Sequence, residues 1–185
     1  AYMSKIPHQA IVLDSMSKRY SLCGARLGAI VSLNGELMSG VLRIAQGRLS
    51  SGFIDQAMAS KLVHVPHQYI ENVQKEYELR RDVLFSGLQN IPGVTVQKPE
   101  GAFYVIVGLP VDDSEAFCQW LLTDFRDPSA SSGQAETIMI APAGGFYATE
   151  GKGKNEVRIA YVLNTQDLKR SIDLLRIALD LYSKK

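Results

Sequence analysis

The stretch Ser15–Gly28 reads SMSKRYSLCGARLG, and it decides how the rest of the sequence is interpreted. It places Lys18 directly after two serines, Ser15 and Ser17, and eight residues before Arg26. A lysine amine reacts with carbonyl groups when burial or neighbouring cations strip its proton, and Arg26 is a permanent cation. Hydroxyl groups and a planar guanidinium also match the oxygens of a phosphate. The stretch therefore predicts an active-site loop with a reactive lysine beside a bound phosphate.

A lysine next to a phosphate-binding loop suggests pyridoxal phosphate as the cofactor. The pattern Ser-x-Ser-Lys followed by Gly-x-Arg-x-Gly resembles the lysine loop of class I/II aminotransferases, the aspartate aminotransferase branch of the fold-type I pyridoxal phosphate enzymes. In that family the lysine that matches Lys18 holds the cofactor as a Schiff base. The resemblance implies that Ser15 and Arg26 bind the cofactor phosphate and that Ser17 also lies at the cofactor. The competing interpretation, a surface lysine in a Gly/Ser-rich loop, does not explain the joint spacing.

Composition excludes several classes of partner. The 185 residues carry 20 basic and 19 acidic side chains, so no polyelectrolyte surface for nucleic acid or for an acidic membrane is expected. No apolar run approaches the roughly 20 residues that a membrane helix needs. The two cysteines, Cys23 and Cys118, are too few and too far apart for a disulfide-stapled secreted domain. We expect a soluble cytoplasmic protein that binds small molecules.

The first part of the chain predicts the end of a larger domain. The short apolar runs 10–13 and 27–31 are typical of buried strands, and two strands alone do not make a stable sheet. We therefore expect them to be inner strands of a larger sheet, and the chain to be the C-terminal part of a longer polypeptide. Helical spacing follows over 36–60, with an interruption at 47–52, and resumes over 54–63.

The remainder predicts a linking helix and a small domain. Pro66 is a good first residue for the long helix that follows it, because proline is tolerated in a first helical turn. The organisation expected is a remnant of the large cofactor-binding domain over 1–65, a linking helix over 66–92 and a small C-terminal domain over 93–185. In the small domain we predict strands over 94–97, 102–107, 137–140 and 156–162, and helices over 114–125 and from Asn164 or Thr165 to the C-terminus. The fold class is α/β: the C-terminal α+β small domain of a fold-type I enzyme, preceded by the last strands and helices of the large domain.

Arg158 is the second informative residue. Alternation along Glu156–Val162 (EVRIAYV) places Arg158 on one face of a strand with Ala160 and Val162. Burying an unpaired guanidinium is costly, so a carboxylate partner is expected. From the residues alone, this partner is equally a protein carboxylate or a ligand. In the aminotransferases the arginine of the matching motif binds the α-carboxylate of the substrate, and the resemblance implies that role for Arg158.

Three further motifs are weighed. Arg48 is a candidate for binding a second carboxylate of a dicarboxylic substrate across a dimer interface, although a solvent-exposed loop arginine is the simpler interpretation. His64 and His67 flank a proline and lack further ligands, so no metal site is expected. The sequence from Gly145 to Gly153 does not match a nucleotide-binding P-loop, because five residues separate the glycines and Gly153 replaces the magnesium-binding hydroxyl.

Taken with the resemblance, the sequence predicts a pyridoxal phosphate-dependent aminotransferase, a homodimer at full length, that exchanges amino groups between an aspartate-like amino acid and a 2-oxo acid. The resemblance also implies that cofactor-binding residues lie upstream of Ala1, so the isolated chain is expected to be inactive. Two alternatives remain open: another fold-type I enzyme, such as a lyase, decarboxylase or acyl-transferring synthase, or a non-catalytic interaction module.

Overall fold

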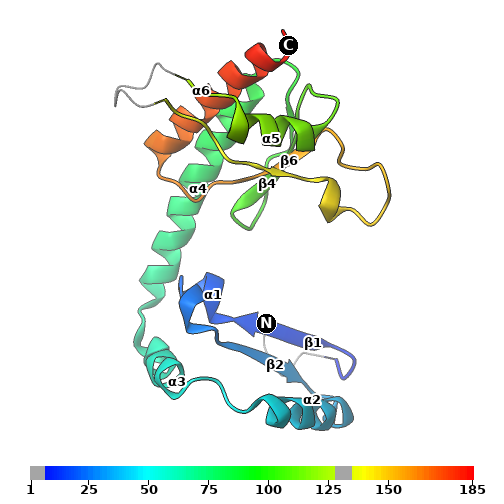
Figure 1. Cartoon of the computed structure of the whole chain (residues 1–185). Helices are drawn as coiled ribbons and strands as arrows, with labels where there is room; N and C mark the ends of the chain where they lie inside the picture. The colour runs from blue at the N-terminus through cyan, green and yellow to red at the C-terminus, as the bar shows by residue number, and fades with distance from the viewer. Residues whose placement is uncertain (1–6, 128–134) are drawn as a thin grey trace. The chain divides into compact units, whose positions relative to one another are not determined.

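A computed structural model of the chain describes residues 7–127 and 135–185. These residues form two compact units, Ala1–Glu71 and Asn72–Lys185. Figure 1 shows the helices and strands of both units, coloured from the N-terminus to the C-terminus. Among the described residues, no helix combines the length and the hydrophobicity that a membrane span requires.

The first unit opens with a two-stranded antiparallel sheet. Strand β1 (Ile11–Ser15) pairs with β2 (Gly28–Ser32), and the register runs from Ile11 opposite Ser32 to Ser15 opposite Gly28. A Cβ atom on Gly28 would lie 2.8 Å from the carbonyl oxygen of Asp14, so this close approach of the two strands requires a glycine. The ladder therefore closes the loop between the strands at Ser15 and Gly28.

Two helices and a 3₁₀ turn complete the first unit. Helix α2 (Gly35–Arg48) begins at Asn34, whose side-chain oxygen accepts a hydrogen bond from the backbone N–H of Leu37. Helix α3 (Phe53–Ala59) follows and continues into the 3₁₀ helix η3 (Ser60–His64). The two predicted helical segments are thus confirmed, and the break between them lies after Arg48 and before Phe53.

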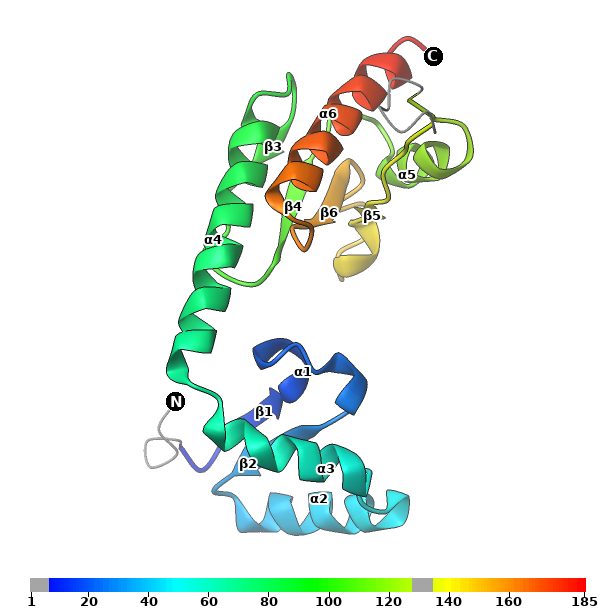
Figure 2. The ribbon, with the colours of Figure 1, turned by 90° about the vertical axis from the view of Figure 1, so that its left-hand side faces the viewer.

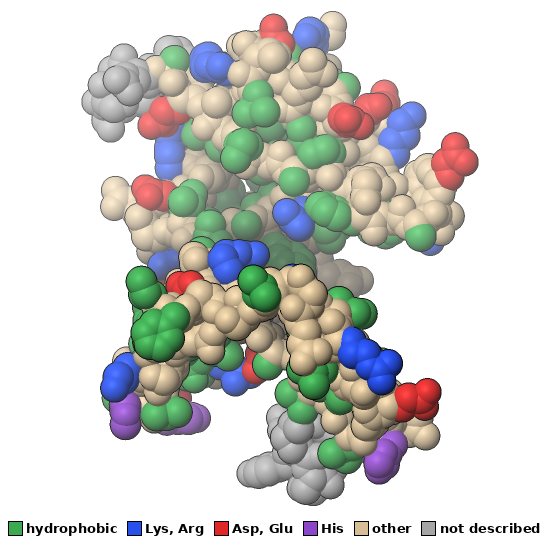
Figure 3. Space-filling model, turned by 60° about the horizontal axis from the view of Figure 1, so that its bottom comes forward, with side chains coloured by type: hydrophobic (Ala, Val, Ile, Leu, Met, Phe, Trp, Pro, Cys, Tyr) green, Lys and Arg blue, Asp and Glu red, His purple; other side chains and the backbone are tan. Residues whose placement is uncertain are grey.

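The first unit exposes much of its apolar surface. Among its described residues only Ala25 is a fully buried hydrophobic residue, whereas the exposed fraction is 74% for Leu13, 75% for Ile44 and 83% for Phe53. Figure 3 shows hydrophobic side chains (green) spread over the surface of this unit, which can be recognised by its histidines (purple). The two predicted strands are confirmed, but in this chain they expose apolar side chains such as Leu13 and Ile30, because the described residues cover them only in part. That they are inner strands of a larger sheet stays a prediction.

The second unit contains most of the long helix α4 (His67–Gln89), which follows Pro66 as predicted. Leu84 and Leu88, near the end of this helix, are buried in the core. Arg80 donates a hydrogen bond from Nη1 to the carbonyl oxygen of Val162 at 2.6 Å, which ties the helix to the segment after the last strand.

Four antiparallel strands form the sheet of the second unit, in the order β3-β4-β6-β5. These strands are β3 (Thr95–Val96), β4 (Tyr104–Gly108), β5 (Ala141–Pro142) and β6 (Glu156–Ala160). The predicted strand 137–140 is wrong: the chain pairs with β6 only from Ala141, and Met139 is 82% exposed. Its β-branched residues have strand propensity, but propensity alone does not make a strand. The register of β5 would bring Ile140 opposite Ile159 of β6, yet the described ladder begins only at Ala141.

Helices cover one face of this sheet. Helix α5 (Ser114–Thr123) begins at the cap Asp113, and helix α6 (Thr165–Tyr182) begins at the cap Asn164. Helices α4 and α6 lie side by side in Figure 2 and meet where Gly87 faces Ile172. The core joins the three helices to the inner side of the central strands through Leu88, Phe117, Leu121 and Leu175 on the helices and Val105, Val107 and Val157 on the sheet. The opposite side of β6 carries Arg158.

Candidate active site

The lysine loop begins where β1 ends. Ser15 is both the last residue of β1 and the N-cap of the short helix α1 (Met16–Arg19), because its Oγ accepts a hydrogen bond from the backbone N–H of Ser17 at 3.1 Å. Lys18 lies within this helical turn and its side chain is exposed. The strand end and the cap together fix the backbone from which the lysine projects.

Arg26 closes the same loop from the other side. It follows the 3₁₀ helix η2 (Cys23–Ala25) and adopts the left-handed conformation, with φ 52°. Non-glycine residues in this conformation are uncommon and carry strain of about 1 to 3 kcal/mol. The Nη1 atom donates to the carbonyl oxygen of Cys23 at 2.9 Å, which orients the guanidinium. The other guanidinium N–H groups have no hydrogen-bond partner among residues 7–127 and 135–185.

The hairpin brings these groups to one end of the first unit. Ser15 lies opposite Gly28 in the ladder, and the backbone N–H of Met16 donates to the carbonyl oxygen of Leu27 at 3.2 Å. Ser15 and Arg26 therefore sit at the two ends of one closed loop that also holds Ser17 and Lys18. Hydroxyl groups, an exposed guanidinium and an exposed amine are the donors that a phosphorylated carbonyl compound needs. The shelter from water that a reactive lysine requires is not provided by the described residues.

Arg158 lies on the face of β6 that the helices leave open. The register places Ile106 of β4 and Ala141 of β5 opposite it, and its guanidinium carbon lies 5.5 Å from the ring centre of Tyr104 and 4.6 Å from that of Phe146. Such contacts stabilise a cation by about 0.5–2 kcal/mol. The expected carboxylate partner is not found among the described residues: Arg158 stacks on aromatic rings instead of forming an ion pair.

The nearest acidic residue along β6 is already engaged. Phe146 ends the 3₁₀ helix η4 (Gly144–Phe146), and the hydroxyl of the next residue, Tyr147, donates a short hydrogen bond to Oε2 of Glu156. This hydrogen bond, together with desolvation and the negative charge of Glu156, raises the pKa of Tyr147 above its ordinary value. The carboxylate of Glu156 is thus directed to a tyrosine and away from the guanidinium of Arg158.

Comparison with known proteins identifies the family. The family model for aminotransferase class I and II matches residues 2–174, which is nearly the whole chain. The chain belongs to the class I and II aminotransferases. It is 26% identical over 178 residues to the aspartate aminotransferase of Pyrococcus horikoshii, and 31% identical over 140 residues to that of Musicola paradisiaca. These alignments cover 94% and 71% of this chain but only 42% and 34% of the two relatives.

Solved aminotransferase structures share the fold. An α-aminoadipate aminotransferase from Thermus thermophilus matches with a TM-score of 0.75 at 22% identity, covering 92% of this chain and 41% of that one. A kynurenine aminotransferase from Pyrococcus horikoshii matches with a TM-score of 0.76 at 22% identity, covering 95% of this chain and 41% of that one. The fold class predicted from the sequence is thereby confirmed as part of a fold-type I enzyme. Class I and II aminotransferases use pyridoxal phosphate.

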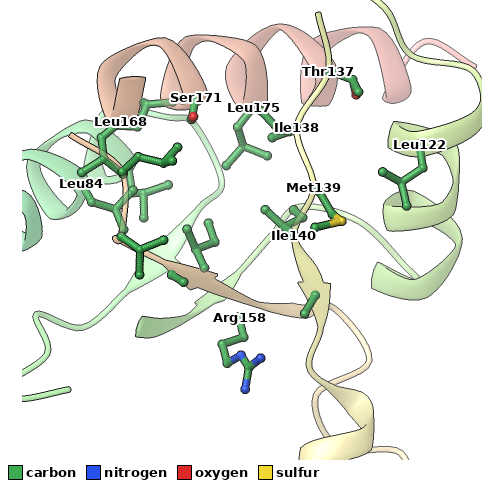
Figure 4. Close-up of a pocket in the computed structure, with 17 residues that line it drawn as sticks. Leu84, Leu122, Thr137, Ile138, Met139, Ile140, Arg158, Leu168, Ser171 and Leu175 are labelled. Atoms are coloured by element: carbon green, nitrogen blue, oxygen red, sulfur yellow. The ribbon is translucent and has the colours of Figure 1, made fainter. Parts of the chain in front are cut away.

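A cavity of about 690 Å³ lies beside β6 in this aminotransferase chain, and most of its lining is aliphatic. Figure 4 shows Leu84, Leu168 and Leu175 on one side of the strand, whereas the side chain of Arg158 extends from the other side. Among the described residues that line this cavity, Arg158 is the only charged one. The cavity therefore lies on the helix-covered face of the sheet, and the guanidinium of Arg158 lies on the open face.

Sequence reasoning missed the residues that surround Arg158. Tyr104 lies on β4, and only the strand register brings it diagonally next to Arg158, so no local pattern announces it. For Phe146, Tyr147 and Glu156 the sequence does contain a signal. The alternation that places Arg158 on the open face also places Glu156 there, and the two aromatic residues follow a glycine-rich turn that returns toward β6.

The other sequence candidates lie apart from these groups. Arg48 is the last residue of α2 and is exposed. The Nδ1 atom of His67 lies 3.1 Å from Oε1 of Glu71, one helical turn further along α4. Residues 151–154 belong to the exposed loop between β5 and β6, in which Gly151 and Gly153 have φ of 78° and 72°.

Proposed function

We propose that this chain supplies the cofactor-binding lysine and the carboxylate-binding arginine of a pyridoxal phosphate-dependent aminotransferase. The observation that carries the proposal is the closed loop on the β1–β2 hairpin. It joins Ser15, Ser17, Lys18 and Arg26 in one short segment, and the family match covers this segment.

Ser15, Ser17 and Arg26 would hold the cofactor phosphate. The Arg26 guanidinium is already oriented by its bond to the Cys23 carbonyl oxygen and has further N–H groups to donate. The cofactor, once bound, supplies an electron sink for the bonds at the substrate α-carbon. The amine of Lys18 would attach the cofactor covalently and, when released by a substrate amine, carry a proton to and from the α-carbon.

Arg158 would bind the α-carboxylate of the amino acid or 2-oxo acid. The rings of Phe146 and Tyr104 hold the guanidinium without neutralising it, which leaves its N–H groups for a ligand. Because the two curated relatives compared above are named aspartate aminotransferases, we propose an aspartate-like amino acid as the substrate. Arg48 remains a proposed contact for a second carboxylate.

We further propose that the whole protein is a homodimer and that the 185-residue chain alone has negligible transaminase activity. The chain spans less than half of the length of these relatives, and its first unit leaves most of its apolar side chains exposed. Aspartate and 2-oxoglutarate supplied to the purified chain with pyridoxal phosphate are expected to give no glutamate above the rate of the cofactor alone. Sustained glutamate formation would refute this part of the proposal.

Borohydride trapping tests the assignment of Lys18. The chain is incubated with pyridoxal phosphate and reduced, and peptide mass spectrometry locates the pyridoxyl group. We expect preferential labelling of Lys18 over Lys61, an exposed lysine of the same unit. Lys18→Arg should remove the preferred label, whereas the matched control Lys61→Arg should keep it.

Arg26→Ala extends the same experiment to the phosphate. Without the guanidinium, the preference for Lys18 should fall toward that of an ordinary surface lysine, because phosphate binding no longer concentrates the aldehyde near the amine. Equal labelling of Lys18 and Lys61 in the unchanged protein would overturn the proposed cofactor site.

A further inference from the structure

Two consecutive aromatic residues each contact one charged residue of β6. Phe146 places its ring 4.6 Å from the guanidinium carbon of Arg158, and Tyr147 donates its hydroxyl proton to the carboxylate of Glu156. Both aromatic residues lie at the end of η4, and both charged residues lie on the open face of β6. One turn of the chain thus contacts a cation and an anion separately.

Glu156 and Arg158 are natural partners for each other. Residues two apart in a strand project from the same face, and both side chains are long enough to meet across that spacing. Nevertheless the described residues show no ion pair between Glu156 and Arg158. The carboxylate of Glu156 instead accepts a hydrogen bond from the hydroxyl of Tyr147.

We propose that Tyr147 is a positioning residue that holds the Glu156 carboxylate away from Arg158 and so keeps the Arg158 guanidinium available to the carboxylate of a ligand. This inference rests on the proposed role of Arg158. Without the hydroxyl of Tyr147, Glu156 becomes an internal competitor that occupies the guanidinium for part of the time. The apparent affinity for the ligand is then the intrinsic affinity multiplied by the fraction of Arg158 that remains open.

The loop between β5 and β6 is built to keep Tyr147 in place. A Cβ atom on Gly153 would lie 2.5 and 2.6 Å from two carbons of the Tyr147 ring, so only a glycine lets the returning loop pass at this distance. The backbone N–H of Glu156 donates to the carbonyl oxygen of Gly153 at 3.0 Å, which fixes the start of β6 against the same loop. The ring and its acceptor are therefore positioned by one short segment.

Three variants of the 185-residue chain test the inference: Tyr147→Phe, Glu156→Gln, and the two combined. Succinate is the probe, and its binding is followed by NMR at the Nε–H signal of Arg158, which Arg158→Lys identifies by its loss. Exposed ion pairs are weak, so we expect Tyr147→Phe to weaken succinate binding by roughly two- to sixfold. Glu156→Gln alone should bind at least as well as the unchanged chain, and the combined variant should recover that affinity.

Rescue by Glu156→Gln separates positioning from a general loss of structure. Unchanged affinity in Tyr147→Phe, or no recovery in the combined variant, would overturn the inference. If Tyr147→Phe does not fold, Gly153→Ala displaces the same ring by another route, and the same loss and the same rescue are expected.

The signal of Arg158 without ligand distinguishes this inference from the proposed function. In Tyr147→Phe the Nε–H signal should shift, because Glu156 now reaches the guanidinium, and the shift should vanish in the combined variant. If succinate leaves this signal unmoved in the unchanged chain, the carboxylate-binding role of Arg158 fails. A shift in Tyr147→Phe would then still confirm that Tyr147 diverts Glu156, and its absence would refute that.

Discussion

Gly153 shows how one residue fixes the surroundings of a charged site. Its φ of 72° lies in the left-handed region, and a side chain there would meet the ring of Tyr147 and the carbonyl carbon of Ala143, the latter at 3.2 Å. Gly151, in the same loop, has φ of 78° but nothing within 4 Å of an added Cβ atom. The two glycines therefore separate the cost of backbone strain from the cost of crowding.

We predict that Gly151→Ala destabilises the second unit by about 1 kcal/mol and Gly153→Ala by about 2 to 4 kcal/mol. The first substitution strains only the backbone, whereas the second also pushes a ring aside. Urea unfolding followed by the fluorescence of Trp120, the single tryptophan, measures both changes. Equal losses for the two variants would show that the ring of Tyr147 moves freely and that the crowding argument is wrong.

At the residue scale, sequence reasoning finds groups whose chemistry shows in local spacing. Ser15, Lys18 and Arg26 are predicted as site residues because an amine, a hydroxyl and a guanidinium lie within one loop. Arg158 is predicted because a charged residue interrupts an apolar strand. Tyr104 could not be found, because its approach to Arg158 depends on the pairing of β4 with β6, and strand register is not visible in a single segment.

Helix α6 illustrates the scale of the element. The side-chain oxygen of Asn164 accepts hydrogen bonds from the backbone N–H groups of Gln166 and Asp167 at 3.0 and 2.9 Å. These two donors would otherwise lack partners within the helix. Because α6 buries Leu168 and Leu175 in the core, fraying at its start exposes part of that core.

Asn164→Ala is therefore expected to lower the free energy of unfolding of the second unit by about 1 kcal/mol. Ser183→Ala, at the opposite end of the same helix, is the matched control and should change it by less than about 0.5 kcal/mol. Both variants are compared by urea denaturation, and one common slope of the free energy of unfolding against urea concentration is used for both. A loss in Ser183→Ala as large as that in Asn164→Ala would contradict the capping argument.

Element types follow from periodicity more reliably than strand pairing does. The amphipathic spacing of α4 and α6 survives in the structure because a helix satisfies its own backbone hydrogen bonds. A strand needs a neighbour. Residues 137–140 have the composition of a strand, but β6 pairs only with Ala141 and Pro142, so the prediction fails there.

At the scale of the molecule, the two units differ in how they are held together. Of the described hydrophobic residues that are fully buried, all except Ala25 lie in the second unit. Burying apolar surface stabilises a fold by about 25 cal/mol per Å², and without it an isolated two-stranded sheet is marginally stable at best. The first unit of the isolated chain therefore has little stability of its own.

Hydrogen exchange should resolve this difference within one sample. The backbone amides of β1 and β2 are expected to exchange faster than those of β4, β6 and α6, which should be protected up to the free energy of global unfolding. The second unit serves as the internal control. Slow exchange throughout β1 and β2 would show that another contact stabilises the first unit.

The unpaired segment 137–140 gives this chain a chemical reporter. Met139 is 82% exposed and its side chain borders the aliphatic cavity, whereas Met16 and Met38 are partly buried. Thioether oxidation to the sulfoxide follows exposure, so Met139 is expected to be oxidised ahead of those two when the chain is treated with dilute hydrogen peroxide. Any polypeptide that covers this edge in a longer protein would slow the oxidation of Met139, and a sulfoxide count by mass would map that cover without a label.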